Sequence, residues 1–165
     1  MLVNEKSFGK EQITVKIDKL LPTVPLSFFG DPINGSTGYA LCLFDESNTL
    51  IATLRANRPR DLCGTVPCWK LVGGIGYKYS DKVLASDGVL QFLFRSGPAG
   101  TGKIVGKAKR NLAKGLTALP VGVAAQLTGD RRATVQLMSS NAGCLTGAVT
   151  NVQEASGLLF KGSTP

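Results

Sequence analysis

Hydrophobic and polar residues alternate along much of the chain, most strictly in QITVKIDK at positions 12–19. The three β-branched apolar residues of this segment fall on one side and polar residues on the other, which predicts a half-buried strand. YALCLFD at 39–45 is apolar on both sides and predicts a central strand. TLIATLRA at 49–56 follows after a short turn, so these two segments predict a hairpin.

Short segments of the same kind recur to the end of the chain, joined by turns rich in glycine. The further expected strands are at 68–72, 77–81, 89–96, 103–110, 133–140, 144–152 and 158–160. Residues 111–130 lack the pattern and predict a long loop or a short helix. The whole therefore predicts an all-β fold, an antiparallel β-sandwich or jelly roll of about eight to ten strands with at most one short helix. No domain boundary is visible, so residues 1–165 are expected to form a single β-sandwich domain.

The positive charge of the chain is concentrated in its second half. The formal net charge is +8, and residues 88–153 contain eight Lys or Arg against the single acid Asp130. Such a field favours an anionic polymer or polysaccharide as partner, with nucleic acid as a less favoured one. The candidate polyanion-binding residues are Lys103, Lys107, Lys109, Arg110 and Lys114, of which the first three share one strand face. The alternative is a basic, solvated face with no partner.

An aromatic cluster suggests a second binding surface. Trp69, Tyr77 and Tyr79 lie close together in the sequence beside several lysines. Aromatic faces next to polar groups are how all-β modules hold sugar rings, so these three residues are candidates for carbohydrate binding. The alternative is that they belong to the core, because strand alternation leaves open whether Trp69 or Lys70 points outward.

Four cysteines in a chain without histidine favour two disulfides in an oxidising compartment. Cys63 and Cys68 are near enough in sequence to close a small loop, and Cys42 and Cys144 lie in two otherwise apolar strands. We therefore expect the bonds Cys63–Cys68 and Cys42–Cys144, which is one of the three pairings that four cysteines allow. The spacings fit neither a zinc site nor a C-x-x-C redox pair, so no metal and no cofactor are expected.

Residues 97–103, GPAGTGK, match the G-x-x-x-x-G-K pattern of a phosphate-binding loop. Ile104 follows where that motif needs Ser or Thr to bind magnesium. The next residues alternate like a strand, whereas the motif needs a helix whose N-terminal amides hold the phosphates. The segment is therefore interpreted as a hairpin turn.

Catalytic groups are hard to assemble from this sequence. The absence of histidine removes the Ser–His and Cys–His nucleophile pairs. Paired carboxylates remain as an alternative, and the candidate acids, all near expected turns or strand ends, are Asp31, Asp45, Glu46, Asp61, Asp81 and Asp87. Acids at such positions are usually solvated turn residues, so no catalytic residue is assigned and the protein is expected not to be an enzyme.

The motifs LCLFD, CGTVPCWK, GYKYSDK and GKIVGKAK carry a resemblance to a known family. Over roughly residues 8–162 the chain resembles an uncharacterised all-β domain that recurs, often near the C-terminus, in large secreted bacterial proteins. In that family a Tyr-Lys-Tyr-x-Asp-Lys segment precedes a glycine turn and a Gly-Lys-rich strand, here residues 77–82 and 100–109. The resemblance implies an extracellular or cell-envelope setting and an accessory role.

The sequence thus predicts a non-catalytic extracellular accessory or interaction module stabilised by two disulfides. The alternative function is binding of a polyanion or carbohydrate by a β-sandwich, through the basic strand or the aromatic patch. No apolar run in the sequence is long enough to span a bilayer.

Overall fold

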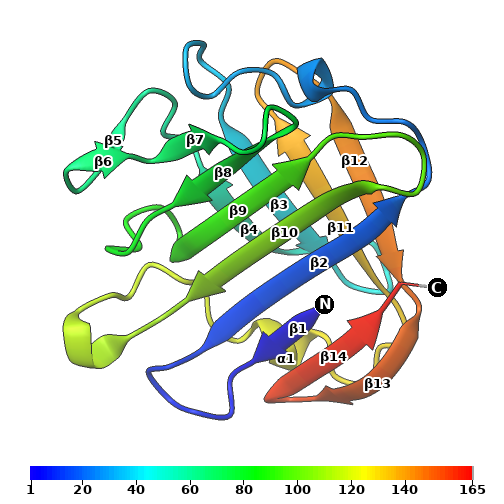
Figure 1. Cartoon of the computed structure of the whole chain (residues 1–165). Coiled ribbons are helices and arrows are strands. Elements are labelled where there is room, and N and C mark those ends of the chain that lie inside the picture. Colours follow the sequence, from blue (N-terminus) through cyan, green and yellow to red (C-terminus); the bar gives the residue numbers. More distant parts are fainter. Residues whose placement is uncertain (165) are drawn as a thin grey trace.

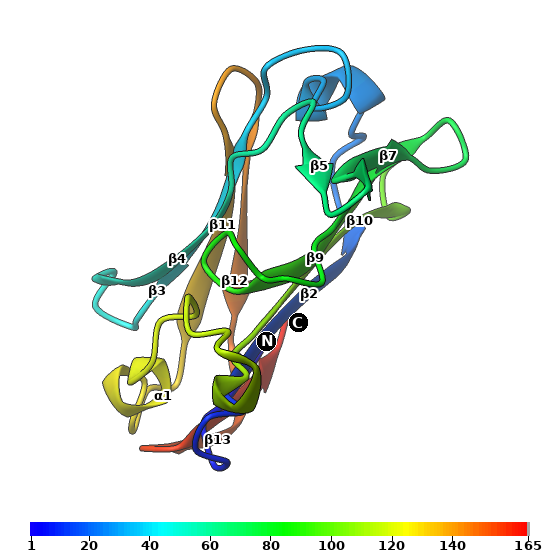
Figure 2. The same cartoon turned by 90° about the vertical axis from the view of Figure 1, so that its left-hand side faces the viewer.

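The computed structural model describes residues 1–164 and consists of two antiparallel β-sheets packed against each other. Figure 1 looks onto the larger sheet, with the smaller one behind it, and Figure 2 shows the two layers from the side. The predicted all-β sandwich with one short helix is confirmed. No helix in the described part of the chain is long and apolar enough to cross a membrane.

The larger sheet has eight strands in the order β13-β14-β1-β2-β10-β9-β8-β7. Their bounds are β1 (Leu2–Asn4), β2 (Gln12–Leu20), β7 (Trp69–Leu71), β8 (Gly76–Ser80), β9 (Val89–Arg95), β10 (Gly102–Lys109), β13 (Asn151–Ser156) and β14 (Leu159–Ser163). Strand β1, which the sequence pattern did not predict, joins the two ends of the chain, because it pairs with β2 on one side and with β14 on the other.

The smaller sheet has four strands in the order β12-β11-β3-β4. These are β3 (Tyr39–Phe44), β4 (Leu50–Ala56), β11 (Ala133–Ser139) and β12 (Cys144–Val149). A separate two-stranded hairpin consists of β5 (Leu62–Cys63) and β6 (Val66–Pro67). The helical elements are the short helix α1 (Val123–Gln126) and the 3-10 turns η1 (Leu26–Phe29) and η2 (Leu112–Lys114).

The strands of the two sheets cross steeply, as the opposite slants of β3 and β10 in Figure 1 show. The chain passes from one sheet to the other at Thr150, between β12 and β13. The segment 144–152, predicted as one strand, is therefore two strands in different sheets. Such a change of sheet forms a corner of the sandwich, which alternation alone does not reveal.

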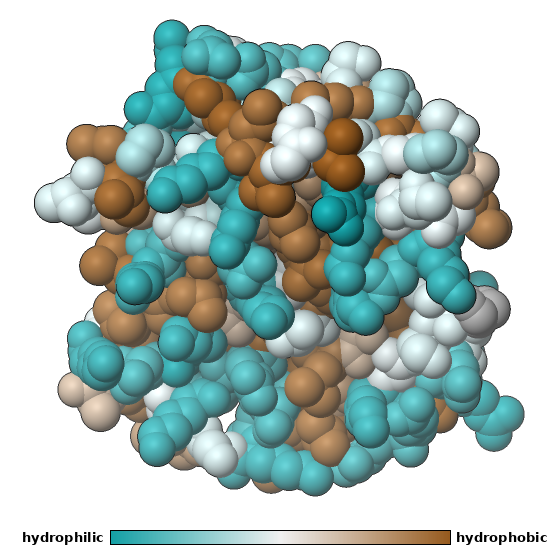
Figure 3. Space-filling view, viewed as in Figure 1, coloured by the Kyte–Doolittle hydropathy of each residue, from teal (hydrophilic) through white to brown (hydrophobic). Residues whose placement is uncertain are grey.

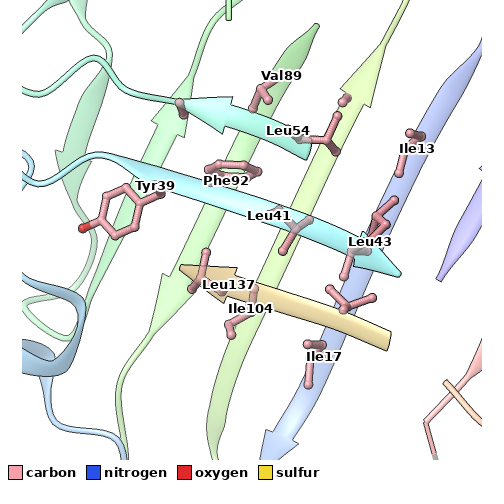
Figure 4. Packing of buried hydrophobic residues seen from close by; sticks show 14 of the residues in the cluster. Ile13, Ile17, Tyr39, Leu41, Leu43, Leu54, Val89, Phe92, Ile104 and Leu137 are labelled. Atoms are coloured by element: carbon pink, nitrogen blue, oxygen red, sulfur yellow. The ribbon is translucent and has the colours of Figure 1, made fainter. Parts of the chain in front are cut away.

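The core lies between the sheets, where the inward residues of both meet (Figure 4). Ile13 and Ile104 come from the larger sheet and Leu41 and Leu137 from the smaller, and all four are buried. The sheets approach each other closely at Gly106, where an added Cβ would lie 2.8 Å from Leu41 Cδ2. Strand alternation therefore sends the apolar side of each strand inward and leaves the other side of each sheet to solvent.

Candidate functional site

The outer face of the eight-stranded sheet is strongly basic. Directly opposite residues of an antiparallel pair point to the same side of the sheet, so the register of the strands shows which residues share this face. Within residues 1–164, the strand residues that bring positive charge to it are Lys16, Lys70, Lys78, Arg95, Lys103, Lys107, Lys109 and Lys161, against the acids Asp18 and Glu154. Figure 3 looks onto this face and shows hydrophilic side chains spread across it, with apolar ones between them.

Asp18 neutralises part of this charge. Its carboxylate pairs with Lys16 and, at 3.0 Å, with the Nζ of Lys103. Partial burial would raise the pKa of Asp18, but the ionic hydrogen bonds from the two lysines outweigh it and lower that pKa below its ordinary value. The other six basic residues of the face make no ion pair with any of the described residues.

Two pairs of like charges lie directly opposite each other on neighbouring strands of this face. Lys70 of β7 faces Lys78 of β8, and Arg95 of β9 faces Lys103 of β10. Like charges at directly opposite positions destabilise a sheet, because the side chains are held within a few ångströms of each other. Lys70 and Lys78 have no acidic partner among the described residues, so their repulsion costs stability in the isolated protein, and an anion lying over the face would relieve it. At Lys103 the carboxylate of Asp18 already offsets part of the repulsion.

The predicted basic cluster is only partly brought together. Lys103, Lys107 and Lys109 lie on the outer face, as their spacing along one strand predicted. Arg110 instead lies just beyond β10, 3.8 Å from the carboxylate of Glu11, and Lys114 is in η2, outside the sheet.

Five basic residues of the face were missed by the sequence reasoning: Lys16, Lys70, Lys78, Arg95 and Lys161. Each occupies a polar position of an alternating strand, which was a usable signal. Their alignment depends on the order of the strands in the sheet, which the sequence pattern did not provide.

The outer face of the four-stranded sheet provides a contrast. The only charged residue in β3, β4, β11 and β12 is Arg55, which pairs with Asp87 at 3.5 Å. Apart from Arg55, the charge carried by strands therefore lies on the outer face of the eight-stranded sheet.

The predicted carbohydrate platform is wrong as an exposed aromatic surface. Trp69, Tyr77 and Tyr79 are all buried, with exposed fractions of 3%, 7% and 0%. Trp69 lies directly opposite Tyr79, so both take the inner side of the sheet while the lysines between them take the outer side. Their rings join the core, where Trp69 packs against Tyr39 with ring centres 4.8 Å apart.

The cysteine prediction is half right. Cys63 and Cys68 form the predicted disulfide, which closes the β5–β6 hairpin. Cys42 and Cys144 are free thiols, the first buried and the second exposed. They cannot bond because β11 lies between their strands, which separates them by about two strand spacings, or roughly 10 Å, more than a disulfide spans. The protein therefore has one disulfide and not the two expected.

The Cys63–Cys68 bridge lies beside a buried acid. The carboxylate of Asp81 is fully buried and accepts hydrogen bonds from the Tyr79 hydroxyl and from two backbone amides. Arg58 joins Asp81, at 3.4 Å, to Asp61, at 2.7 Å. These bonds satisfy a group that would be very costly to bury alone, so the network holds the loops around the hairpin.

The remaining candidate acids are also engaged in local structure. Each accepts a hydrogen bond from a backbone amide, and they are Asp31, Asp45, Glu46 and Asp87. No group of three metal-ligating side chains occurs among residues 1–164. The glycine-rich segment 97–103 leads into strand β10, with no helix after it, and Lys103 binds Asp18.

Comparisons with protein-family models, with curated proteins and with solved structures each find no match to this chain. The resemblance to a domain of secreted bacterial proteins therefore stays a prediction from sequence. The strongest candidate site in the described residues is the basic outer face of the eight-stranded sheet.

Proposed function

We propose that this protein is a non-catalytic interaction module of an extracellular or cell-envelope setting, and that it binds an anionic polymer on the outer face of the eight-stranded sheet. The observation that carries the proposal is the presence of two directly opposed pairs of like charges, Lys70 with Lys78 and Arg95 with Lys103. A fold without an anionic partner gains nothing from such pairs, since they only weaken the sheet.

The spacing of the charges suits an extended ligand. Neighbouring strands lie about 4.8 Å apart, and alternate residues of one strand, such as Lys107 and Lys109, lie about 7 Å apart. The basic residues therefore form a grid that a linear polymer can follow in several registers. Binding of this kind depends on counterion release and weakens steeply as salt rises.

An acidic polysaccharide is favoured over a single-stranded nucleic acid. Proteins that hold single strands stack bases on exposed aromatic rings. Among residues 1–164, Phe8 is the one aromatic residue that is strongly exposed, at 86%. It lies in the loop between β1 and β2 and not on the strands of the face. The strand residues between the lysines of the face include Leu93, Val105 and Gln91 and no aromatic residue, so they offer no stacking surface.

Two further observations support the setting and the non-catalytic role. The Cys63–Cys68 disulfide is the kind of bond that persists in an oxidising compartment. The chain has no histidine, and its candidate acids are engaged in turns or in ion pairs.

The test is retention on an immobilised sulfated polysaccharide as the salt concentration is raised. We expect the double variant Lys78→Glu/Lys107→Glu to elute at much lower salt than the native protein, because four units of charge change on the proposed face. The matched control is Arg131→Glu/Arg132→Glu, which makes the same change in net charge at exposed residues before β11. Equal loss of retention in both variants would reduce the effect to net charge and contradict a specific face.

A further inference from the structure

A cavity of about 360 Å³ lies beside the disulfide hairpin, at the edge of the eight-stranded sheet. Pro32 and Trp69, both buried, contribute to its inner wall, and Leu62 and Pro67 of the hairpin contribute exposed apolar walls. The volume falls within the range of small-ligand sites, and an apolar interior with a few polar groups is their usual composition. The cavity is separate from the basic outer face, because Trp69 points to the inner side of β7 and Lys70 to the outer side.

Of the charged residues in the cavity wall, one cation has no ion-pair partner among the described residues. Asp61 is already bound by Arg58 at 2.7 Å and accepts a hydrogen bond from the backbone amide of Leu62. Arg60, an exposed residue that also lines the cavity, makes no ion pair with any residue in the described chain. A free guanidinium next to neutral or compensated groups favours a carboxylate, which it can bind through two parallel hydrogen bonds.

Arg60 is also held in a conformation that its residue type adopts rarely. Its φ is +57°, in the left-handed region, and its backbone amide donates to the carbonyl of Pro32 at 2.9 Å. Non-glycine residues in this region are uncommon, and they persist where the surrounding structure fixes them. The loop containing Arg60 is thereby tied to the loop containing Pro32 and Asn34, and both contribute to the cavity.

The indole of Trp69, a residue of the cavity wall, carries an unsatisfied polar group. Its Nε1–H is buried and has no hydrogen-bond acceptor within residues 1–164. The ring itself packs against Tyr39 and Tyr79, so the residue is fixed in place by the core. A buried donor without an acceptor is costly and rare in native structures, and the residue that carries it lines the cavity.

We propose that this cavity binds one carboxylate-bearing sugar residue, a hexuronate, of an acidic polysaccharide. Arg60 pairs with the carboxylate, while the Asp61 carboxylate accepts hydrogen bonds from ring hydroxyls and the Asn34 amide donates to them or accepts from them. Leu62 and Pro67 contact the apolar side of the ring. A doubly charged phosphate suits the cavity less well, since the Asp61 carboxylate at the rim repels the added negative charge.

The inference rests on the proposed function and deepens it, because it names the sugar unit at one end of the bound polymer that enters the cavity. Strand β7 is the edge strand of its sheet, so a single chain can turn around that edge. Such a chain would contact Lys70 on the outer side and the cavity on the inner side.

The experiment uses the fluorescence of Trp69, the only tryptophan in the protein. The full chain is titrated with glucuronate and galacturonate, with the neutral sugars glucose and galactose at equal concentration, and with inorganic sulfate at matched ionic strength. We expect a saturable fluorescence change and a raised melting temperature with at least one uronate, and neither response with the neutral sugars or sulfate. Arg60→Asn, which keeps a residue tolerant of the left-handed conformation, should weaken uronate binding by more than about tenfold.

The matched control is Arg131→Asn, which removes an equal charge at an exposed residue outside the cavity and should leave the uronate titration unchanged. If neither fluorescence nor melting temperature responds to any uronate, or if neutral sugars or sulfate give the same response, the cavity proposal is overturned. Polymer retention that depends on Lys78 and Lys107 would still hold in that case. Uronate binding without such retention would instead contradict the outer-face proposal, so the two failures are distinguishable.

Discussion

Replacing Lys78 by glutamate should stabilise the protein and at the same time weaken its binding to an anionic polymer. Lys78 lies directly opposite Lys70 on the outer face, and both side chains are exposed. The substitution turns a repulsive cross-strand pair into an attractive one. Since a surface lysine is normally neutral or helpful for stability, a gain on removing it identifies the repulsion.

The magnitude follows from the position of the pair. Cross-strand pairs of opposite charge contribute roughly 0.2–1 kcal/mol, like charges cost a similar amount, and exposure to solvent keeps both near the lower end. We therefore expect Lys78→Glu to raise the free energy of unfolding by about 0.5–1 kcal/mol. For a chain of 165 residues this corresponds to a melting temperature higher by about 1–4 °C.

The assay is thermal unfolding of the native protein, Lys78→Gln and Lys78→Glu at low and at high salt. The glutamine variant removes the repulsion without adding attraction, so its melting temperature should lie between the other two. High salt should shrink the differences, because exposed charges are screened over about one Debye length. A glutamate variant that melts at or below the native temperature in low salt would refute the reasoning that these two lysines repel each other across β7 and β8.

Three further predictions concern the disulfide, the free thiols and the acid of the outer face. The variant Cys63→Ala/Cys68→Ala should melt about 6 °C lower than the native protein under non-reducing conditions. A bridge with a sequence separation of 5 contributes about 2 kcal/mol to stability in the chain-entropy model. An unchanged melting temperature would be inconsistent with the bond. In the native protein an alkylating reagent should modify Cys144 alone, because the Cys42 thiol is buried and burial raises its pKa. After the protein is unfolded, mass spectrometry should find Cys42 as the second free thiol. Asp18→Asn should raise the salt concentration needed for elution from the polysaccharide, since it frees the two lysines that the carboxylate holds. The lowered pKa of Asp18 stabilises the fold above the ordinary aspartate range, and this contribution is lost as the pH falls through the lowered pKa. The native protein should therefore lose more stability there than the variant, in which Asp31 and Asp61 still have lowered pKa values.

Much of the fold could be predicted because strand alternation is a local property. The segment predicted at 12–19 is β2, Gln12–Leu20, and the segment at 103–110 is β10, Gly102–Lys109. The order of the strands depends on contacts between distant residues and could not be predicted in this way. The strand break at Thr150 was missed for the same reason.

The errors in the candidate sites have the same origin. An alternating strand has two faces, and the sequence of β7 alone did not show whether Trp69 or Lys70 faces the core. The register with β8 places Trp69 beside Tyr79 on the buried side. Cys42 was expected in the core because its neighbours are apolar, but both it and Cys144 lie on the solvent side of the four-stranded sheet.

The local disulfide and the strand face of Lys103, Lys107 and Lys109 were predictable because each depends on residues near in sequence. The full basic face was not, since its members come from β2, β7, β8, β9, β10 and β14. The like-charged pairs, which carry the functional proposal, become visible only when the register of those strands is known.

The most direct test of the central proposal is the dissociation constant of a soluble sulfated polysaccharide measured at several salt concentrations, for the native protein and for Lys107→Gln. We predict that the logarithm of the association constant falls linearly with the logarithm of the salt concentration, and that the variant has a shallower slope, by about one unit for the single lysine removed. The same slope in both proteins, or an affinity that does not change with salt, would contradict the proposal that the outer face of the eight-stranded sheet binds an anionic polymer.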